Sequence, residues 1–338
     1  MSKKTVQTIE DIARLAEVSK STVSRALNDS PLIKPETRER IQAIAREHNF
    51  RINQPARNLS MRQSRTIAYV THAHHLECFS MDDLFGLEIM GGIASGLHSL
   101  GYDFLVVHVD PRDTGWAHQY LDSGRVDGFI LMTSSRKQQH IKALVEMNAP
   151  FIVWGIPAPK YNNCCSVTGD NLGGGALATE HLIRSGRQRI AFLGGPSDEA
   201  EVQLRFRGYE TALQSAGRSV EPALLEYGDY SHASGIAAMQ RLLKQSPDID
   251  AVFTNSDLMA IGAINVIQNS GKRVPEDIAV VGYDDLSVAN YNNLPLTTVR
   301  QNIPLAGRLL AQNLIQYIQT GVVTNVILPV ELVVRKSA

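Results

Sequence analysis

The sequence predicts a small all-α N-terminal head followed by an α/β core built on doubly wound parallel sheets. Residues 8–28 read TIEDIARLAEVSKSTVSRALN, in which apolar residues recur at helical spacing and one short turn interrupts the pattern. After residue 65, apolar runs of strand length alternate with amphipathic helical stretches. With 338 residues, the chain is long enough for such a head and two further domains of ordinary size.

The head is expected to hold three helices. The first begins after Thr8, whose hydroxyl can accept the backbone N–H of Asp11. The pattern breaks at Val18, Ser19 can cap a second helix, and a third follows Pro35. The apolar faces are expected to share a miniature core made of Ile9, Ile12, Ala13, Ala16, Val23, Ala26, Leu27, Ile41, Ile44, Ala45 and His48.

The second helix carries a polar face opposite its apolar one. Lys and Arg can bond the acceptors of guanine in a DNA major groove, and Ser can serve either base type. This face therefore has the chemistry of a DNA-reading helix. The alternative is a small helical bundle with a solvated polar face. The residues concerned are Lys20, Ser21, Ser24, Arg25 and Asn28.

Charge is divided unevenly along the chain. Residues 1–65 hold 13 Lys and Arg against 7 Asp and Glu, a net charge of +6, and the remainder holds 20 against 27, a net charge of −7. A basic head supplies attraction to phosphates, whereas an acidic body does not compete for the polymer. The asymmetry favours a head that binds nucleic acid.

In the order of its N-terminal motifs the chain resembles the lac repressor family of bacterial transcription regulators, also called LacI/GalR. The motifs are EVSKSTVSRALN, KPETRERI and FRINQPARNL. The resemblance implies that the second helix reads bases in the major groove through Lys20, Ser21 and Arg25. Glu17 departs from the family, which usually has glycine at the end of the first helix; in a left-handed conformation it would cost about 1 kcal/mol.

The resemblance also implies a hinge helix that folds on the operator and inserts a leucine from each subunit into the minor groove. An apolar wedge that unstacks a base step is offset by better contacts with the bent duplex. By position the wedge is Leu59, and the hinge is supported by Asn53, Ala56 and Arg57.

Seven apolar runs after residue 65 are expected to be strands. Continuous apolar strands between helices are typical of parallel sheets covered on both faces. Ligand sites in such sheets lie beyond the carboxyl ends of the strands. The expected strands are 66–70, 104–107, 128–132, 151–154, 189–193, 251–254 and 278–282.

Polar and aromatic residues follow these runs, which suits a polyhydroxylated ligand with hydroxyls to bond and an apolar face to stack. IAFLGGP, LRFRGY, GDY, TNSDLMAIG, VVGYDD and LTTVRQN resemble the family's effector-binding core, which is related in fold to periplasmic sugar-binding proteins. The resemblance implies two doubly wound parallel-sheet subdomains and an effector cleft lined by Arg205, Tyr230, Ser256 and Asp284. We also expect His72, Phe85 and Trp154 in this site.

Some residues near the expected cleft have a second interpretation. Trp154 is either a stacking platform or part of the core. Asp257 and Asp285 are expected to cap helices or shape turns. Gly155 departs from the family, which commonly has an acidic residue after that strand.

The expected domain boundaries combine these observations with the family's architecture. Residues 1–52 form the helix-turn-helix DNA-binding domain, 53–65 the hinge helix and linker, and 66–338 the effector-binding and dimerisation core. Within the core, one subdomain comprises 66–163 and 293–324, and the other 164–292 and 325–338. The chain therefore crosses between them near Asn163, Asn292 and Thr324.

No metal or cofactor is expected. His72, His74, His75 and Cys78 have ligand chemistry but no spacing that fixes a tetrahedron, so a cleft-lining loop is the commoner use. The chain has three cysteines, and the adjacent pair Cys164 and Cys165 argues against a disulfide framework. We find no signal peptide or membrane span, and a cytoplasmic location is expected.

Three classes of function remain to be compared. An enzyme is disfavoured because no P-loop, GxSxG, HExxH or complete dinucleotide motif occurs, and the glycines at 173–175 are better explained by close packing. A solute-binding protein would leave the basic head unexplained. The remaining hypothesis is a homodimeric regulator, usually a repressor of carbohydrate-utilisation genes, that binds palindromic operator DNA and responds to a sugar or glycoside effector; a purine or another metabolite is the alternative effector.

Overall fold

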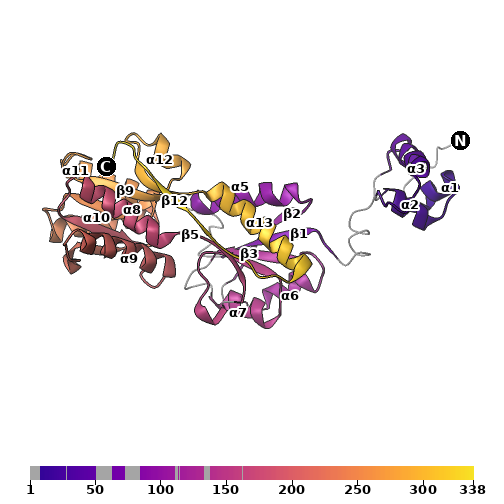
Figure 1. The fold of residues 1–338 in the computed structure, drawn as a ribbon, viewed down its shortest axis with the longest axis horizontal. Helices are drawn as coiled ribbons and strands as arrows, with labels where there is room; N and C mark the ends of the chain where they lie inside the picture. Colours follow the sequence, from indigo (N-terminus) through magenta and orange to yellow (C-terminus); the bar gives the residue numbers. More distant parts are fainter. Residues whose placement is uncertain are drawn as a thin grey trace. The chain divides into compact units, whose positions relative to one another are not determined.

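The computed structural model describes residues 8–27, 29–50, 63–72, 84–110, 113, 115–132, 138–161 and 163–338. The chain divides into two compact units, Met1–Ser64 and Arg65–Ala338 (Figure 1). Among the described residues, no helix has the length and apolar character needed to cross a membrane.

The N-terminal unit contains the three predicted helices, α1 (Ile9–Leu15), α2 (Lys20–Leu27) and α3 (Pro35–Glu47). Thr8 and Asp11 form a reciprocal capping box at the start of α1, and the Ser19 hydroxyl accepts the N–H of Thr22 at the start of α2. Glu17 follows α1 with φ 52°, the left-handed conformation that disfavours any side chain.

The core of this unit is made of the predicted apolar residues, with one correction. Ile12, Val23, Ala26 and Ile41 are fully buried at its centre. His48 was expected in this core but is exposed, because it follows the last turn of α3 as its C-cap. Phe50 packs against the core instead.

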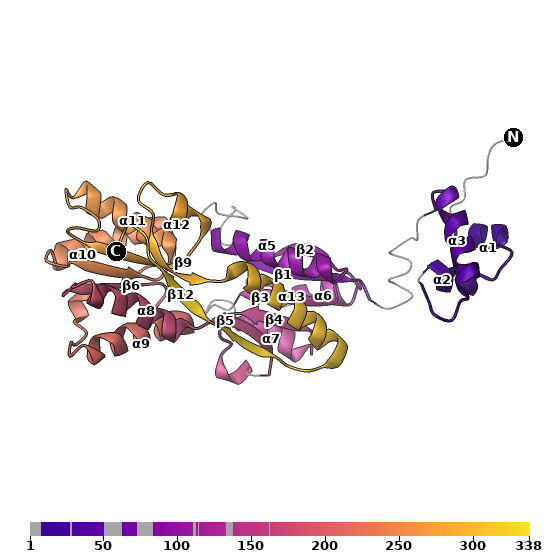
Figure 2. The ribbon, with the colours of Figure 1, turned by 45° about the horizontal axis from the view of Figure 1, so that its top comes forward.

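The described residues of the C-terminal unit form two six-stranded sheets, as predicted for two doubly wound subdomains (Figures 1 and 2). The sheet of the first subdomain has the order β11-β5-β4-β3-β1-β2, and all its pairings are parallel. Its strands are β1 (Thr66–His72), β2 (Asp103–Val109), β3 (Gly128–Met132), β4 (Phe151–Trp154), β5 (Cys165–Gly169) and β11 (Asn325–Leu328).

The sheet of the second subdomain has the order β12-β10-β9-β8-β6-β7. Its pairings are parallel except at one edge, where β12 runs antiparallel to β10. Its strands are β6 (Ile190–Gly194), β7 (Leu225–Tyr227), β8 (Ala251–Thr254), β9 (Ala279–Asp284), β10 (Thr297–Gln301) and β12 (Val330–Val333).

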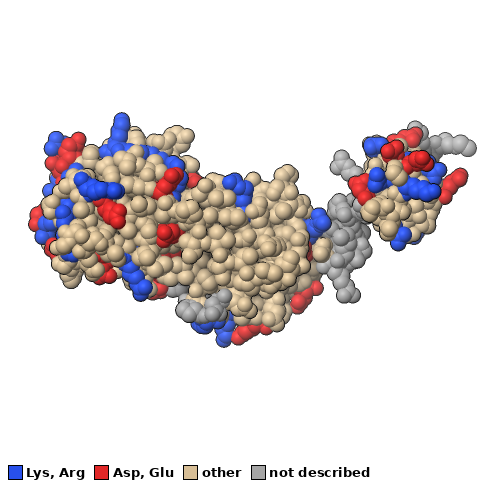
Figure 3. Space-filling model, in the orientation of Figure 1, with Lys and Arg blue, Asp and Glu red and all other residues tan. Residues whose placement is uncertain are grey.

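Helices cover both faces of each sheet, because successive strand residues point to opposite faces and both are apolar. In the first subdomain, α5 (Leu84–Ser99) and α13 (Ile303–Thr320) pack on one face, while α6 (Trp116–Leu121) and α7 (Gln138–Glu146) pack on the other. A short 3-10 helix, Pro159–Tyr161, follows β4. On the face drawn in Figure 3, few charged side chains lie over α5 and α13.

The second subdomain is layered in the same way. The pair α8 (Asn171–Arg184) and α9 (Ala200–Ser215) covers one face, and the pair α10 (His232–Gln245) and α11 (Asp257–Asn269) covers the other. The 3-10 helix Pro222–Leu224 precedes β7, and the short helix α12 (Ser287–Tyr291) follows β9.

The chain crosses between the subdomains three times, and each crossing lies later than expected. The crossings follow β5, β10 and β11, near residues 170, 302 and 329, instead of Asn163, Asn292 and Thr324. Turn residues at the expected positions resemble a boundary, but in each case one more strand joins the sheet before the chain leaves it. The hinge segment expected at 53–65 falls mostly outside the described residues.

Candidate functional site

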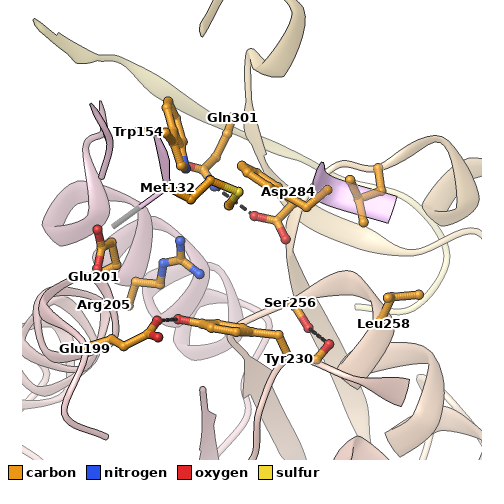
Figure 4. A pocket seen from close by; sticks show the side chains of 12 residues that line it. Met132, Trp154, Glu199, Glu201, Arg205, Tyr230, Ser256, Leu258, Asp284 and Gln301 are labelled. Carbon is orange, nitrogen blue, oxygen red and sulfur yellow. Dashed lines mark hydrogen bonds between the residues drawn. The ribbon is translucent and has the colours of Figure 1, made fainter. Parts of the chain in front are cut away.

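A pocket lies between the two subdomains, and its empty space is about 700 Å³ when the open solvent at its mouth is included (Figure 4). It is found at the carboxyl ends of the strands, where the doubly wound architecture predicts a ligand site. The first subdomain contributes Phe85, Met132 and Trp154, and Gln301 lies where the chain leaves β10. The second subdomain contributes Glu199, Glu201, Arg205, Tyr230, Ser256, Leu258, Asp284 and Leu286.

Arg205, on α9, is almost completely buried, and its charged group is held by contacts on several sides. Its Nε donates to the side-chain oxygen of Asn171 at 2.8 Å, and its Nη1 donates to the carbonyl of Asn255 at 2.7 Å. The guanidinium lies 3.7 Å from the centroid of the Tyr283 ring, a cation–π arrangement. Two bonds and the ring fix the plane of the guanidinium, which points into the pocket in Figure 4.

Asp284 ends β9 and faces the same pocket. Its φ of 113° lies where side chains are unfavourable, which marks a strained position of the kind found at functional sites. One carboxylate oxygen accepts the Gln301 side-chain N–H at 2.8 Å. Burial raises the pKa of Asp284 to about 7, although Arg205 and the Gln301 bond act in the opposite direction.

Two neighbouring acids support the loop that carries Asp284. Asp285, with φ 58°, pairs through its two oxygens with Arg300 and Arg335, each at 2.6 Å, and shapes the loop as predicted. Asp257 differs from its prediction because Ser256 is the N-cap of α11. The buried Asp257 carboxylate instead accepts the backbone N–H of Leu286 at 2.7 Å and the hydroxyl of Thr298 at 2.5 Å.

Aromatic rings form much of the remaining wall. Trp154 lies in the first subdomain's core, where it is 8% exposed, and it also lines the pocket; its use as a stacking platform stays a prediction. Its ring centroid lies 5.8 Å from that of Phe85. On the opposite wall, the Tyr230 hydroxyl donates to Glu199 at 2.9 Å. The Tyr230 ring lies so close to Gly195 that a Cβ at that position would collide with it.

Ser256 lines the pocket, but its hydroxyl is already engaged. It donates to the carbonyl of Tyr230 at 3.1 Å and accepts the N–H of Met259 at 3.2 Å. Both contacts lie within the second subdomain, so Ser256 fixes the Tyr230 loop against the start of α11.

The structure thus brings together six of the seven residues expected at an effector site. His72 ends β1, but its side chain lies outside the described part of the chain, as do His74, His75 and Cys78. Among the described residues, no group of three His, Cys, Asp or Glu side chains is placed to hold a metal. The glycines at 173–175 serve close packing, since a Cβ on Gly175 would meet the Arg205 backbone at 2.1 Å.

Sequence reasoning missed half of the lining residues. Glu201 precedes Arg205 by one helical turn, and Met132 ends a predicted strand, so position could have indicated both. Gln301 lies in the quoted motif LTTVRQN, but its strand was not predicted. The complete set of missed residues is Met132, Glu199, Glu201, Leu258, Leu286 and Gln301.

In the N-terminal unit, Lys20, Ser21 and Arg25 are exposed along α2, and none packs in its core. The Lys20 ammonium contacts the carboxylate of Glu10 on α1. The Ser21 hydroxyl lies 2.7 Å from that of Ser19. Asn28 and the expected hinge residues Asn53, Ala56, Arg57 and Leu59 lie outside the described residues.

Comparison with known proteins finds similarity along the whole chain. Residues 8–53 match bacterial regulatory proteins of the lacI family, and residues 179–338 match a periplasmic binding protein-like domain. The HTH-type transcriptional regulator CelR of Thermobifida fusca is 37% identical over 345 residues, which cover 100% of both chains.

Solved structures give the same result. A complex of the transcriptional regulator CelR with cellobiose is 36% identical and has a TM-score of 0.75, covering 98% of this chain and 99% of that one. The lac repressor dimer bound to operator and the anti-inducer ONPF is 31% identical and has a TM-score of 0.81, covering 98% of both chains.

Proposed function

We propose, from the premise that the chain belongs to the lacI family of bacterial regulatory proteins, that it represses carbohydrate-utilisation genes. The protein is a ligand-responsive transcriptional regulator that binds palindromic operator DNA as a dimer, and a small effector in the pocket switches its operator affinity. It acts in the cytoplasm by binding and carries out no catalysis. Its regulator relatives and the exposed basic face of α2 support this proposal.

The effector is a neutral sugar, and the composition of the pocket is the observation that carries this assignment. Arg205, Asp284 and Gln301 offer donors and acceptors in fixed positions, as hydroxyls require. Trp154 and Phe85 offer ring surface for the apolar face of a sugar. Because the CelR relative was solved with cellobiose, cellobiose is the first compound to test.

Contacts with DNA are assigned by position. Lys20, Ser21 and Arg25 read bases in the major groove, since all three are exposed on one helix and have suitable donors. Leu59 is the minor-groove wedge, and Asn53, Ala56 and Arg57 support the hinge.

Fluorescence anisotropy tests the proposal directly. The purified protein would be titrated, at fixed salt, against a palindromic duplex that it has selected from a random pool, with and without cellobiose, monosaccharides and purines. We expect tight binding that one sugar alters. A response to a purine alone would assign the alternative effector class, and failure to select any duplex would refute the regulator assignment.

A further inference from the structure

A hydrogen bond joins the two subdomains beside the pocket. Glu201 lies in the first turn of α9, in the second subdomain, and lines the pocket. Its Oε1 accepts the backbone N–H of Ile156, which follows β4 of the first subdomain, at 2.8 Å. A carboxylate acceptor makes this bond stronger than one between neutral groups.

The loop after β4 is built to present that N–H. Gly155 has φ 110°, a conformation that L side chains rarely adopt. Its own N–H donates to Val167 on β5 at 2.8 Å, which fixes the loop on its sheet, while the next N–H donates across to Glu201. The family commonly has an acidic residue at this position, and its side chain would be strained at this φ.

A second hydrogen bond also joins the two subdomains, but it is supported by apolar packing. Ser287, at the start of α12, donates its N–H to Glu88 of α5 at 2.8 Å, and the adjacent Leu286 packs in the core of the first subdomain. Apolar packing therefore reinforces that second contact. Loss of the Glu201 bond should loosen the subdomains without separating them.

We propose that Glu201 is a positioning residue that sets the balance between closed and open arrangements of the two subdomains, before any effector binds. This inference rests on the proposed function, because the subdomain arrangement is read out as operator affinity. Glu201 also lies one helical turn from Arg205 on α9, and both line the pocket. A shift of Glu201 when its bond breaks or forms should therefore also move Arg205.

The test compares Glu201→Ala, Glu201→Gln and the wild type, with Glu210→Ala as the matched control on the same helix. Glu210 does not line the pocket. Hydrogen exchange over residues 150–160 reports the bond, and effector-free affinity for a palindromic duplex selected by the wild type reports its consequence. We expect about tenfold faster exchange in Glu201→Ala and about threefold or more change in affinity. Glu201→Gln keeps an acceptor oxygen and should lie nearer the wild type.

A residue that merely contacts ligand would leave effector-free affinity unchanged. Wild-type affinity in Glu201→Ala, in protein that folds normally by circular dichroism, therefore overturns the proposal. If the wild type selects no duplex, the proposed function fails, and the effector-free radius of gyration by X-ray scattering decides instead. Unequal radii for wild type and Glu201→Ala would keep the positioning role, and equal radii would remove it.

Discussion

Asp284 is a buried acidic residue with a strained backbone conformation. It is 6% exposed, its backbone has φ 113°, and burial raises its pKa to about 7. A carboxyl group with such a pKa changes charge within the physiological range, whereas an ordinary aspartate does not. The pocket should therefore respond to pH.

We expect sugar binding to weaken as pH falls through 7, because ligand hydroxyls donate best to the ionised carboxylate. Titration calorimetry with the effector should give about tenfold weaker affinity at pH 6 than at pH 8, since each pH unit below the pKa is a factor of ten. Asp284→Asn should bind weakly with no such dependence. An equal pH dependence in the variant would assign the titration to another group.

The stability of the fold should depend on pH in the opposite direction to sugar binding. The folded pKa of Asp284 lies above its ordinary value of 3.8, so the group favours the folded state below that value, and this contribution is lost as pH rises through 7. Urea unfolding of the effector-free wild type should accordingly show a fall between pH 4 and 7 that Asp284→Asn reduces.

Residue identities at the pocket were predictable where a strand end or a motif marked them. Arg205, Tyr230 and Asp284 fall at such places. Gln301 was missed because its bond to Asp284 lies in a strand that was not predicted. The position of Glu201, one turn before Arg205, could have indicated that it lines the pocket, but not which residue it bonds. Glu201 meets Ile156 only after both subdomains have formed.

At the scale of elements, the contact between α8 and α9 positions Arg205. The helices approach so closely that a Cβ on Gly175 would lie 2.1 Å from the Arg205 carbonyl oxygen, and one on Gly208 would lie 2.2 Å from that of Leu172. Backbone atoms cannot move aside as a flexible side chain can. The position of the guanidinium therefore depends on glycine in the neighbouring helix.

Gly175→Ala should destabilise the fold by about 1–3 kcal/mol through overpacking and should weaken effector binding by displacing Arg205. Gly91→Ala on α5 is the matched control, because its Cβ would meet nothing within 4 Å and alanine is the better helix former. Urea unfolding and calorimetry measure both effects. Equal stability of the two variants would mean that the helices can separate at little cost.

The helix α2 is the element expected to read DNA. Arg25 is exposed in its last turn, where a bidentate contact with guanine is possible. Arg25→Ala should cost about 1–3 kcal/mol at one operator position and relax the base preference there. Arg14→Ala removes the same charge from α1 and should leave base preference unchanged. Duplex selection with both variants checks this, and an unaltered profile for Arg25→Ala would exclude Arg25 from the readers.

Strands were predictable from the sequence where the residues that they bury are apolar. The runs at 151–154 and 251–254 are strands with those bounds, whereas β10, reading TTVRQ, was missed. Thr297 and Thr298 are fully buried in β10, and their hydroxyls bond Ala338 and Asp257, each 41 residues away. No local pattern can indicate a strand whose polar groups are satisfied at that distance.

At the scale of the whole molecule, a basic head and an acidic core divide two binding functions between two units. The division between head and core was predictable because charge and periodicity change together near residue 65. The exact crossings between subdomains were not, since turn residues alone do not show which sheet the next strand joins.

Coupling between the two binding functions must be reciprocal. If the effector changes operator affinity by some factor, the operator must change effector affinity by the same factor, and about 1–3 kcal/mol, or 5- to 150-fold, is usual. Effector affinity would be measured on free protein and on protein saturated with the selected duplex, and duplex affinity with and without saturating effector. We expect equal factors in the wild type and the loss of both in Asp284→Asn. An effector that shifted duplex affinity yet bound equally well with and without DNA would have to act through the DNA or through another site, because a single pocket linked to the head cannot produce unequal factors.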